Sequence, residues 1–171
     1  MIKLNSKKFP DIFYESDKEI YYHTSQTDTP FDFKFDVSED LTNSTEAMNL
    51  IGSFLDDIDN LKEQALLFVG SIITDKKHKC HDLVIYFFDE QKDVSVVGEE
   101  GLNKMFGTTC HISYDLMLKC LKVVRFGSYI DSGLNKQAFI MDLSFGRSYT
   151  DELLVIYFDT NKNIFCIAHE S

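Results

Sequence analysis

The chain has no Trp, and it is poor in the residues that interrupt regular structure, with 2 Pro and 8 Gly among 171 residues. It therefore has no long Pro-rich or Gly-rich linker, and we expect one domain over residues 1–171, long enough to bury a full hydrophobic core. The chain also lacks an apolar run of about 18 residues and an apolar signal-peptide segment near its start. We expect a cytoplasmic protein that does not bind membranes.

The sequence also lacks the familiar motifs of catalytic, phosphate-binding and metal-binding sites. The chain contains neither of the glycine-rich loops that bind phosphates, no Cys-x-x-Cys and no His-Glu-x-x-His. Its one cluster of basic residues, 76–79, is not interleaved with aromatic residues, so nucleic-acid binding is not expected. We expect no catalytic residues, no cofactor and no metal, and therefore a protein that is not an enzyme.

The charge of the chain is strongly negative and unevenly distributed. It has 28 acidic and 17 basic residues, for a net charge of -11. Residues 1–75 carry 15 acidic residues against 6 Lys, which accounts for -9 of that total. Such a field repels phosphate backbones and attracts basic partners, so we expect a basic protein as the partner.

The first 40 residues have the composition of strands. The segments 12–14 and 19–23 flank a polar stretch, 15–18, and this pattern predicts a hairpin. Farther on, Phe31, Phe33, Phe35 and Val37 alternate with polar residues, which predicts a strand with one solvated face.

Residues 45–73 have the three-to-four-residue spacing of apolar side chains that predicts one amphipathic helix, capped by Asn43, Ser44 or Thr45. The middle of the chain, 75–121, has weaker patterns. The apolar run at 83–88 fits a strand or a helix equally well. Short helices are predicted at 99–106 and 113–121, with Ser113 as the N-cap of the second.

Four strands joined by short turn-like links are predicted at the carboxyl end. Their ranges are 122–130, 137–145, 152–159 and 164–170. Strands, then helices, then strands indicate an α+β fold. We expect an antiparallel sheet of the N-terminal strands and this C-terminal four-strand meander, with helices packed on one face.

Acidic residues on the polar sides of the predicted helix and strands are the candidate partner-binding residues. They are Asp56, Asp57 and Glu63 on the helix, and Asp32, Asp36, Glu39 and Asp40 near the strand. Charge complementarity at such a surface sets association rate and specificity. Tyr21, Tyr22, Tyr129 and Tyr149 are candidate aromatic anchors at its rim.

Two alternatives remain open. Cys80-His81 and Cys110-His111, with His78, have zinc-binding side chains and would serve a small enzyme or metal-binding protein if they met in space. An exposed strand edge would instead suit a homo-oligomeric structural protein, so the sequence leaves a monomer and a homodimer equally open.

The C-terminal pattern has a further implication. It comprises Ala138-Phe139-Ile140-Met141-Asp142-Leu143-Ser144-Phe145, then Thr150 to Asp159, Ile164 and the terminal His169-Glu170-Ser171. Over about the last 35 residues the chain resembles small bacterial α+β domains, including immunity proteins of polymorphic-toxin and contact-dependent growth-inhibition systems. The resemblance implies a non-enzymatic protein that binds and neutralises one cognate toxin domain, and basic nucleases are common among such toxins.

Overall fold

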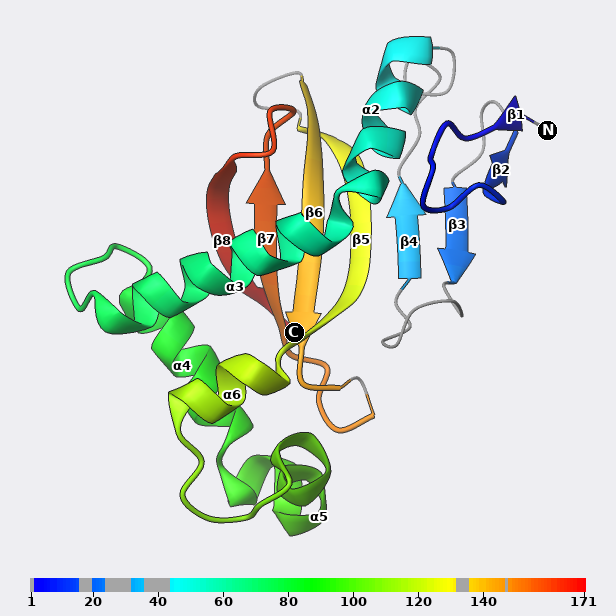
Figure 1. Ribbon diagram of the computed structural model, residues 1–171. Coiled ribbons are helices and arrows are strands. Elements are labelled where there is room, and N and C mark those ends of the chain that lie inside the picture. Colours follow the sequence, from blue (N-terminus) through cyan, green and yellow to red (C-terminus); the bar gives the residue numbers. More distant parts are fainter. Residues whose placement is uncertain (1, 16–19, 24–31, 36–43, 132–135, 147) are drawn as a thin grey trace.

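A computed structural model describes residues 2–15, 20–23, 32–35, 44–131, 136–146 and 148–171. The strands of the larger, six-stranded sheet are β3 (Ile20–His23), β4 (Asp32–Phe35), β5 (Lys122–Asp131), β6 (Lys136–Ser144), β7 (Leu153–Phe158) and β8 (Ile164–Glu170). The helices are α2 (Thr45–Asp56), α3 (Ile58–Thr74), α4 (His81–Gln91), α5 (Val94–Phe106) and α6 (Tyr114–Cys120). The predicted α+β class is confirmed (Figure 1).

The C-terminal meander is confirmed strand by strand. β5, β6, β7 and β8 pair in chain order, each antiparallel to the next. Facing pairs such as Phe139 with Phe158 and Met141 with Ile156 place the large apolar side chains on one side of the sheet. We call this side the inner face, and Figure 1 shows α2 and α3 lying across it.

The N-terminal strands extend the same sheet beside β5. β3 and β4 are antiparallel, but β4 runs parallel to β5, with Asp32 opposite Arg125 and Phe33 opposite Phe126. The sheet is therefore antiparallel in all of its pairings except this one. Its order, β3-β4-β5-β6-β7-β8, leaves β3 and β8 as the two edge strands.

The predicted hairpin between 12–14 and 19–23 is wrong. β2 (Phe13–Tyr14) pairs with β1 (Ile2–Lys3) in a separate two-stranded sheet, whereas β3 belongs to the large sheet. Tertiary packing explains the difference, because four apolar side chains of this N-terminal segment enter the core. They are Leu4, Phe9, Ile12 and Tyr14.

The long helix predicted at 45–73 is two helices. They meet at Asp57, whose φ of −105° and ψ of 11° are not helical. Ser44, one of the three predicted caps, is the N-cap of α2, and its hydroxyl accepts a hydrogen bond from Ala47 N at 3.3 Å. At this break the chain changes direction, so that α2 lies beside the N-terminal segment while α3 crosses the sheet (Figure 1).

The uncertain middle of the chain is helical. The apolar run at 83–88 lies within α4, and the helix predicted at 99–106 is the second part of α5, which kinks at Gly98, where φ is 73°. Ser113 caps α6 as predicted, because its hydroxyl accepts from Leu116 N at 3.2 Å. In Figure 1, α4, α5 and α6 gather at the end of the sheet where β5 and β7 begin.

Phenylalanine rings join the helices to the inner face of the sheet. Phe54 of α2 stacks on Phe139 of β6 with a centroid distance of 3.6 Å, and Phe87 of α4 lies 5.7 Å from Phe145. All four of these side chains are buried. Among the described residues, no helix is long and apolar enough to cross a bilayer.

Candidate functional site

Two of the predicted partner-binding acids make tertiary contacts within the chain. Asp56 accepts hydrogen bonds from Ser6 Oγ at 2.6 Å, Lys7 N at 2.8 Å and Lys8 N at 2.9 Å. Desolvation would raise the pKa of Asp56, but these bonds outweigh it and lower the pKa below its ordinary value. Asp56 therefore holds the N-terminal segment on α2.

Asp57 has a comparable role at the junction of α2 and α3. Its carboxylate accepts from the Asn60 side chain and pairs with Lys162 Nζ at 3.1 Å. The pKa of Asp57 is lowered, first by the bond from Asn60 and then by Lys162, against the opposing effect of desolvation. Lys162 also donates to Ser53 O at 3.1 Å, so it ties the β7–β8 turn to this junction.

The other predicted acids have different placements. Glu63 is exposed on α3, and no hydrogen bond or ion pair is recorded for it within the part of the chain that the structure describes. Asp32 begins β4, but its side chain is outside the description. Asp36, Glu39 and Asp40 lie outside the described residues.

The predicted Tyr anchors are equally scattered. Tyr149 is exposed, whereas Tyr129 is half-buried and its ring lies 6.1 Å from that of Tyr157. Tyr21 and Tyr22 are in β3, and their side chains are not described.

An open, shallow hollow lies beside Glu63 on α3. It has a volume of about 410 Å³ and is lined by Asp59, Lys62, Glu63, Leu66 and Leu67. Leu67 is 68% exposed, the largest fraction for a large hydrophobic side chain among the described residues. A second hollow shares Leu66 and continues onto α6, where it is lined by Asp115, Leu118 and Lys119.

The structure does not bring the predicted Cys/His pairs into a metal site. Cys80, His81, Cys110, His111 and His78 are all described, yet none belongs to a group of three side chains with converging ligand atoms. The alternative of a Cys/His centre therefore loses its geometric basis. All four cysteines of the chain are free thiols.

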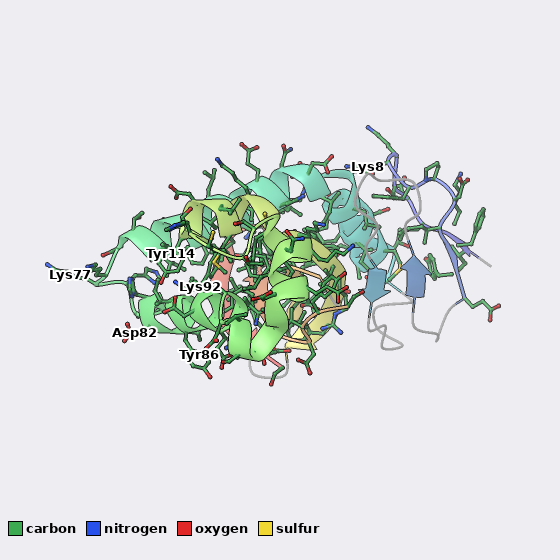
Figure 2. All side chains as sticks on the ribbon, turned by 90° about the horizontal axis from the view of Figure 1, so that it is seen from below. Lys8, Lys77, Asp82, Tyr86, Lys92 and Tyr114 are labelled. Atoms are coloured by element: carbon green, nitrogen blue, oxygen red, sulfur yellow. The ribbon has the colours of Figure 1, made fainter. Side chains whose placement is uncertain are left out.

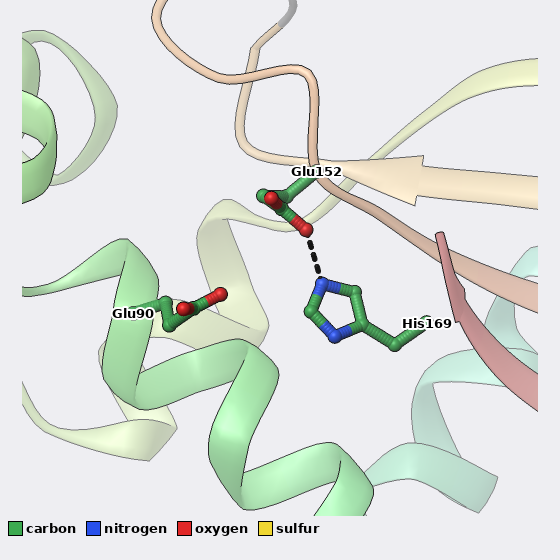
Figure 3. A group of neighbouring side chains, drawn as sticks. All are labelled: Glu90, Glu152 and His169. Carbon is green, nitrogen blue, oxygen red and sulfur yellow. Dashed lines mark hydrogen bonds and ion pairs between the residues drawn. The ribbon is translucent and has the colours of Figure 1, made fainter. Parts of the chain in front are cut away.

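Three other side chains do converge, as Figure 3 shows. Glu90 of α4, Glu152 just before β7 and His169 of β8 each offer a ligand atom within 4.8 Å of the other two. His169 Nε2 and a Glu152 carboxylate oxygen are in direct contact. We call these three residues the Glu/His trio.

Aromatic side chains from α4 hold the trio in place. The Tyr86 hydroxyl donates to the Glu90 carboxylate, and this bond together with the charges of Glu90 and Glu152 raises the pKa of Tyr86. The Tyr86 ring lies 5.7 Å from the His169 ring. The buried Phe87 also makes an edge-to-face contact with the imidazole, with a centroid distance of 5.4 Å.

The end of α4 that carries Glu90 is itself anchored to α6. Asp89 accepts from the Tyr114 hydroxyl at 2.7 Å and pairs with Lys92 Nζ at 2.7 Å. Lys92 also lies over the Tyr114 ring, 4.4 Å from its centroid, and Figure 2 shows the two residues side by side. The same figure shows Lys77, in the loop before α4, extending away from the fold.

Comparisons with protein-family models, curated proteins and solved structures find no match for this chain. The function must therefore be argued from the chain itself. Sequence reasoning overlooked the trio because its members are separated in sequence and belong to no spacing motif. The sequence offered one signal, the predicted neighbouring strands 152–159 and 164–170, whose antiparallel pairing brings His169 close to Glu152.

Proposed function

We propose that the protein is a non-enzymatic immunity protein that binds and neutralises a cognate basic toxin domain. The net charge of -11, concentrated in residues 1–75, supports a basic partner. The C-terminal strand pattern, with its resemblance to immunity proteins of bacterial toxin systems, supports the class. The proposal needs no cofactor, and its binding surface need not contain a nucleophile or a general base.

The observation that carries the proposal is the outward side of α3. Asp59, Glu63 and Leu67 recur every four residues, so they lie along one side of the helix. This side is opposite the buried stripe that includes Leu61, Ala65 and Val69. An exposed apolar side chain beside carboxylates has the organisation of an interface, with an apolar centre and a charged rim.

The structure shows which acidic residues are suitable for substitution in a test of partner binding. Asp56 and Asp57 stabilise the fold through Ser6 and Lys162, so replacing them perturbs folding as well as charge. Glu63 and Leu67 line the hollow and make no such tertiary hydrogen bond among the described residues. A partner that docks on α3 would place a basic side chain at Glu63 and apolar surface on Leu67.

The test is co-expression with the reading frame directly upstream of the gene, followed by co-purification and a growth-rescue assay. We expect a complex and rescue, with a Kd that rises as salt is added, because screening weakens charge pairs. The variant Glu63→Lys/Leu67→Asp should weaken the complex at least about tenfold while melting like the wild type.

A matched control is available on α5. Val96 is 61% exposed and Glu99 is exposed, so Glu99→Lys/Val96→Asp makes the same chemical changes elsewhere. The affinity of this control variant for the cognate partner should stay within about twofold of the wild-type affinity. Absence of both complex and rescue would reject the proposed function, and equal losses in the two variants would remove α3 from the interface.

A further inference from the structure

We propose that the Glu/His trio binds a divalent transition-metal ion. Its three ligand atoms lie within 4.8 Å of one another. Ligand atoms on one tetrahedral zinc ion, each about 2.0–2.2 Å from the metal, lie roughly 3.3–3.6 Å apart. Side-chain rotations that move Glu152 and His169 slightly apart and bring Glu90 closer would close the site, and Figure 3 shows Glu90 directing its carboxylate toward the other two residues.

The ligands come from elements that are rigidly joined. Glu152 immediately precedes β7, where Leu153 pairs with Glu170 and Leu154 pairs with His169. Glu90 comes from α4, which packs against β8. Tyr86 orients the Glu90 carboxylate through its hydroxyl, as the outer hydrogen-bonding partners of metal ligands commonly do. The trio is thus largely arranged before any ion arrives.

The charge of the trio favours a cation. Two carboxylates converge where Glu152 and His169 side chains are only 22% and 15% exposed. In the part of the chain that the structure describes, no Lys or Arg forms an ion pair with Glu90 or Glu152. A divalent cation would balance both carboxylates and relieve their repulsion.

The donor set defines the class of metal. Two carboxylate oxygens and one imidazole nitrogen suit Mn²⁺, Fe²⁺ or Zn²⁺, and the absence of thiolate disfavours Cu⁺. Three protein ligands leave further coordination positions for water. This inference is independent of the proposed function, because the trio lies on α4, β7 and β8 and the proposed interface lies on α3.

The experiment uses the full chain after treatment with a chelator. Mn²⁺ binding is followed by electron paramagnetic resonance and Zn²⁺ binding by calorimetry. Mn²⁺ is the more selective probe, because it prefers oxygen and nitrogen donors to the exposed thiols of Cys110 and Cys166. We expect saturable binding of a single equivalent of each ion.

Two variants and a control connect that binding to the trio. Glu90→Gln should weaken Mn²⁺ binding at least about tenfold without lowering the melting temperature of the metal-free protein, because Glu90 is outside the Glu152–His169 contact. Tyr86→Phe should weaken Mn²⁺ binding about tenfold, because the Glu90 carboxylate loses the hydrogen bond that orients it. Glu99→Gln, which removes an exposed carboxylate from α5, should leave binding unchanged.

Three results would overturn the assignment. One is no saturable binding of either ion below about 1 mM. Another is equal affinity in Glu90→Gln and Glu99→Gln. The third is zinc binding that survives Glu90→Gln but disappears in Cys110→Ser/His111→Asn, since that would assign the ion to the thiol region.

Discussion

Arg125 and Asp142 face each other across β5 and β6, and their side chains form an ion pair on the side of the sheet opposite α2 and α3. The Asp142 side chain is fully buried, whereas that of Arg125 is 28% exposed. A buried carboxylate needs a charged or hydrogen-bonding partner, because desolvation of an unpaired charge is costly. The pair therefore joins two central strands of the sheet, β5 and β6.

Replacing Arg125 by Met should destabilise the protein by about 3 kcal/mol, because the buried Asp142 carboxylate would lose its ion pair with Arg125. Urea denaturation at neutral pH would measure the change. Arg125→Met/Asp142→Leu should recover much of the lost stability, since it removes both charges. If Arg125→Met is as stable as the wild type, the ion pair contributes nothing to the stability of the fold.

Gly52 allows the N-terminal segment to pack on α2. A Cβ at this position would lie 1.9 Å from Asn5 O, so Gly52→Ala must displace that backbone. We expect a loss of about 1–3 kcal/mol, typical of overpacking, and a lower melting temperature. Gly70→Ala on α3 is the control, because a Cβ at this position would lie 3.6 Å from Leu118 Cδ1, an ordinary contact distance. This substitution should stabilise the helix by about 1 kcal/mol.

Acid should loosen the N-terminal segment through Asp56. The pKa of Asp56 in the folded protein lies below its ordinary value of 3.8. The carboxylate therefore contributes its full stabilisation above about pH 3.8. This stabilisation is lost as the pH falls through the lower pKa of the folded state. Asp56→Asn should therefore reduce the loss of stability between about pH 5 and pH 2, measured by urea titrations. An unchanged pH profile in this variant would contradict the assignment to Asp56.

Lys162 should stabilise the junction of α2 and α3. Its Nζ contacts Asp57 Oδ2 and Ser53 O at 3.1 Å and lies 5.5 Å from the centroid of the Phe54 ring. Lys162→Met should cost about 1–2 kcal/mol, seen as a lower midpoint in thermal unfolding. Lys119→Met, on exposed α6 surface, serves as the control and should change stability little.

The sequence predicted the elements whose signals are local. The meander was predictable because alternating apolar residues and short turns both indicate strands. Ser113 was identifiable as a cap from its residue type and position, whereas Ser44 was one of three candidates. The break at Asp57 was not predictable, because the apolar stripe continues across it. Contacts of Asp57 with Asn60 and Lys162, which depend on the folded structure, accompany that break.

Features that depend on distant pairings were missed. The segment 12–14 has strand character, but nothing in its own residues shows that it pairs with Ile2–Lys3. Glu90, Glu152 and His169 likewise carry no common motif, and they meet only because α4 packs at the end of β8. Asp56 and Asp57 have the sequence features of solvated acids, yet they accept tertiary hydrogen bonds.

The parallel pairing of β4 with β5 has a consequence for the order of folding. The meander strands are joined by short turns, so each can pair with little loss of chain entropy. Joining β4 to β5 instead closes a loop of roughly 90 residues, which includes the five helices that the structure describes. The transition state for folding should therefore resemble the meander with its helices, and β3 and β4 should join the sheet late. In native-state hydrogen exchange, amides of β3 and β4 should open at lower free energy than those of β6 and β7.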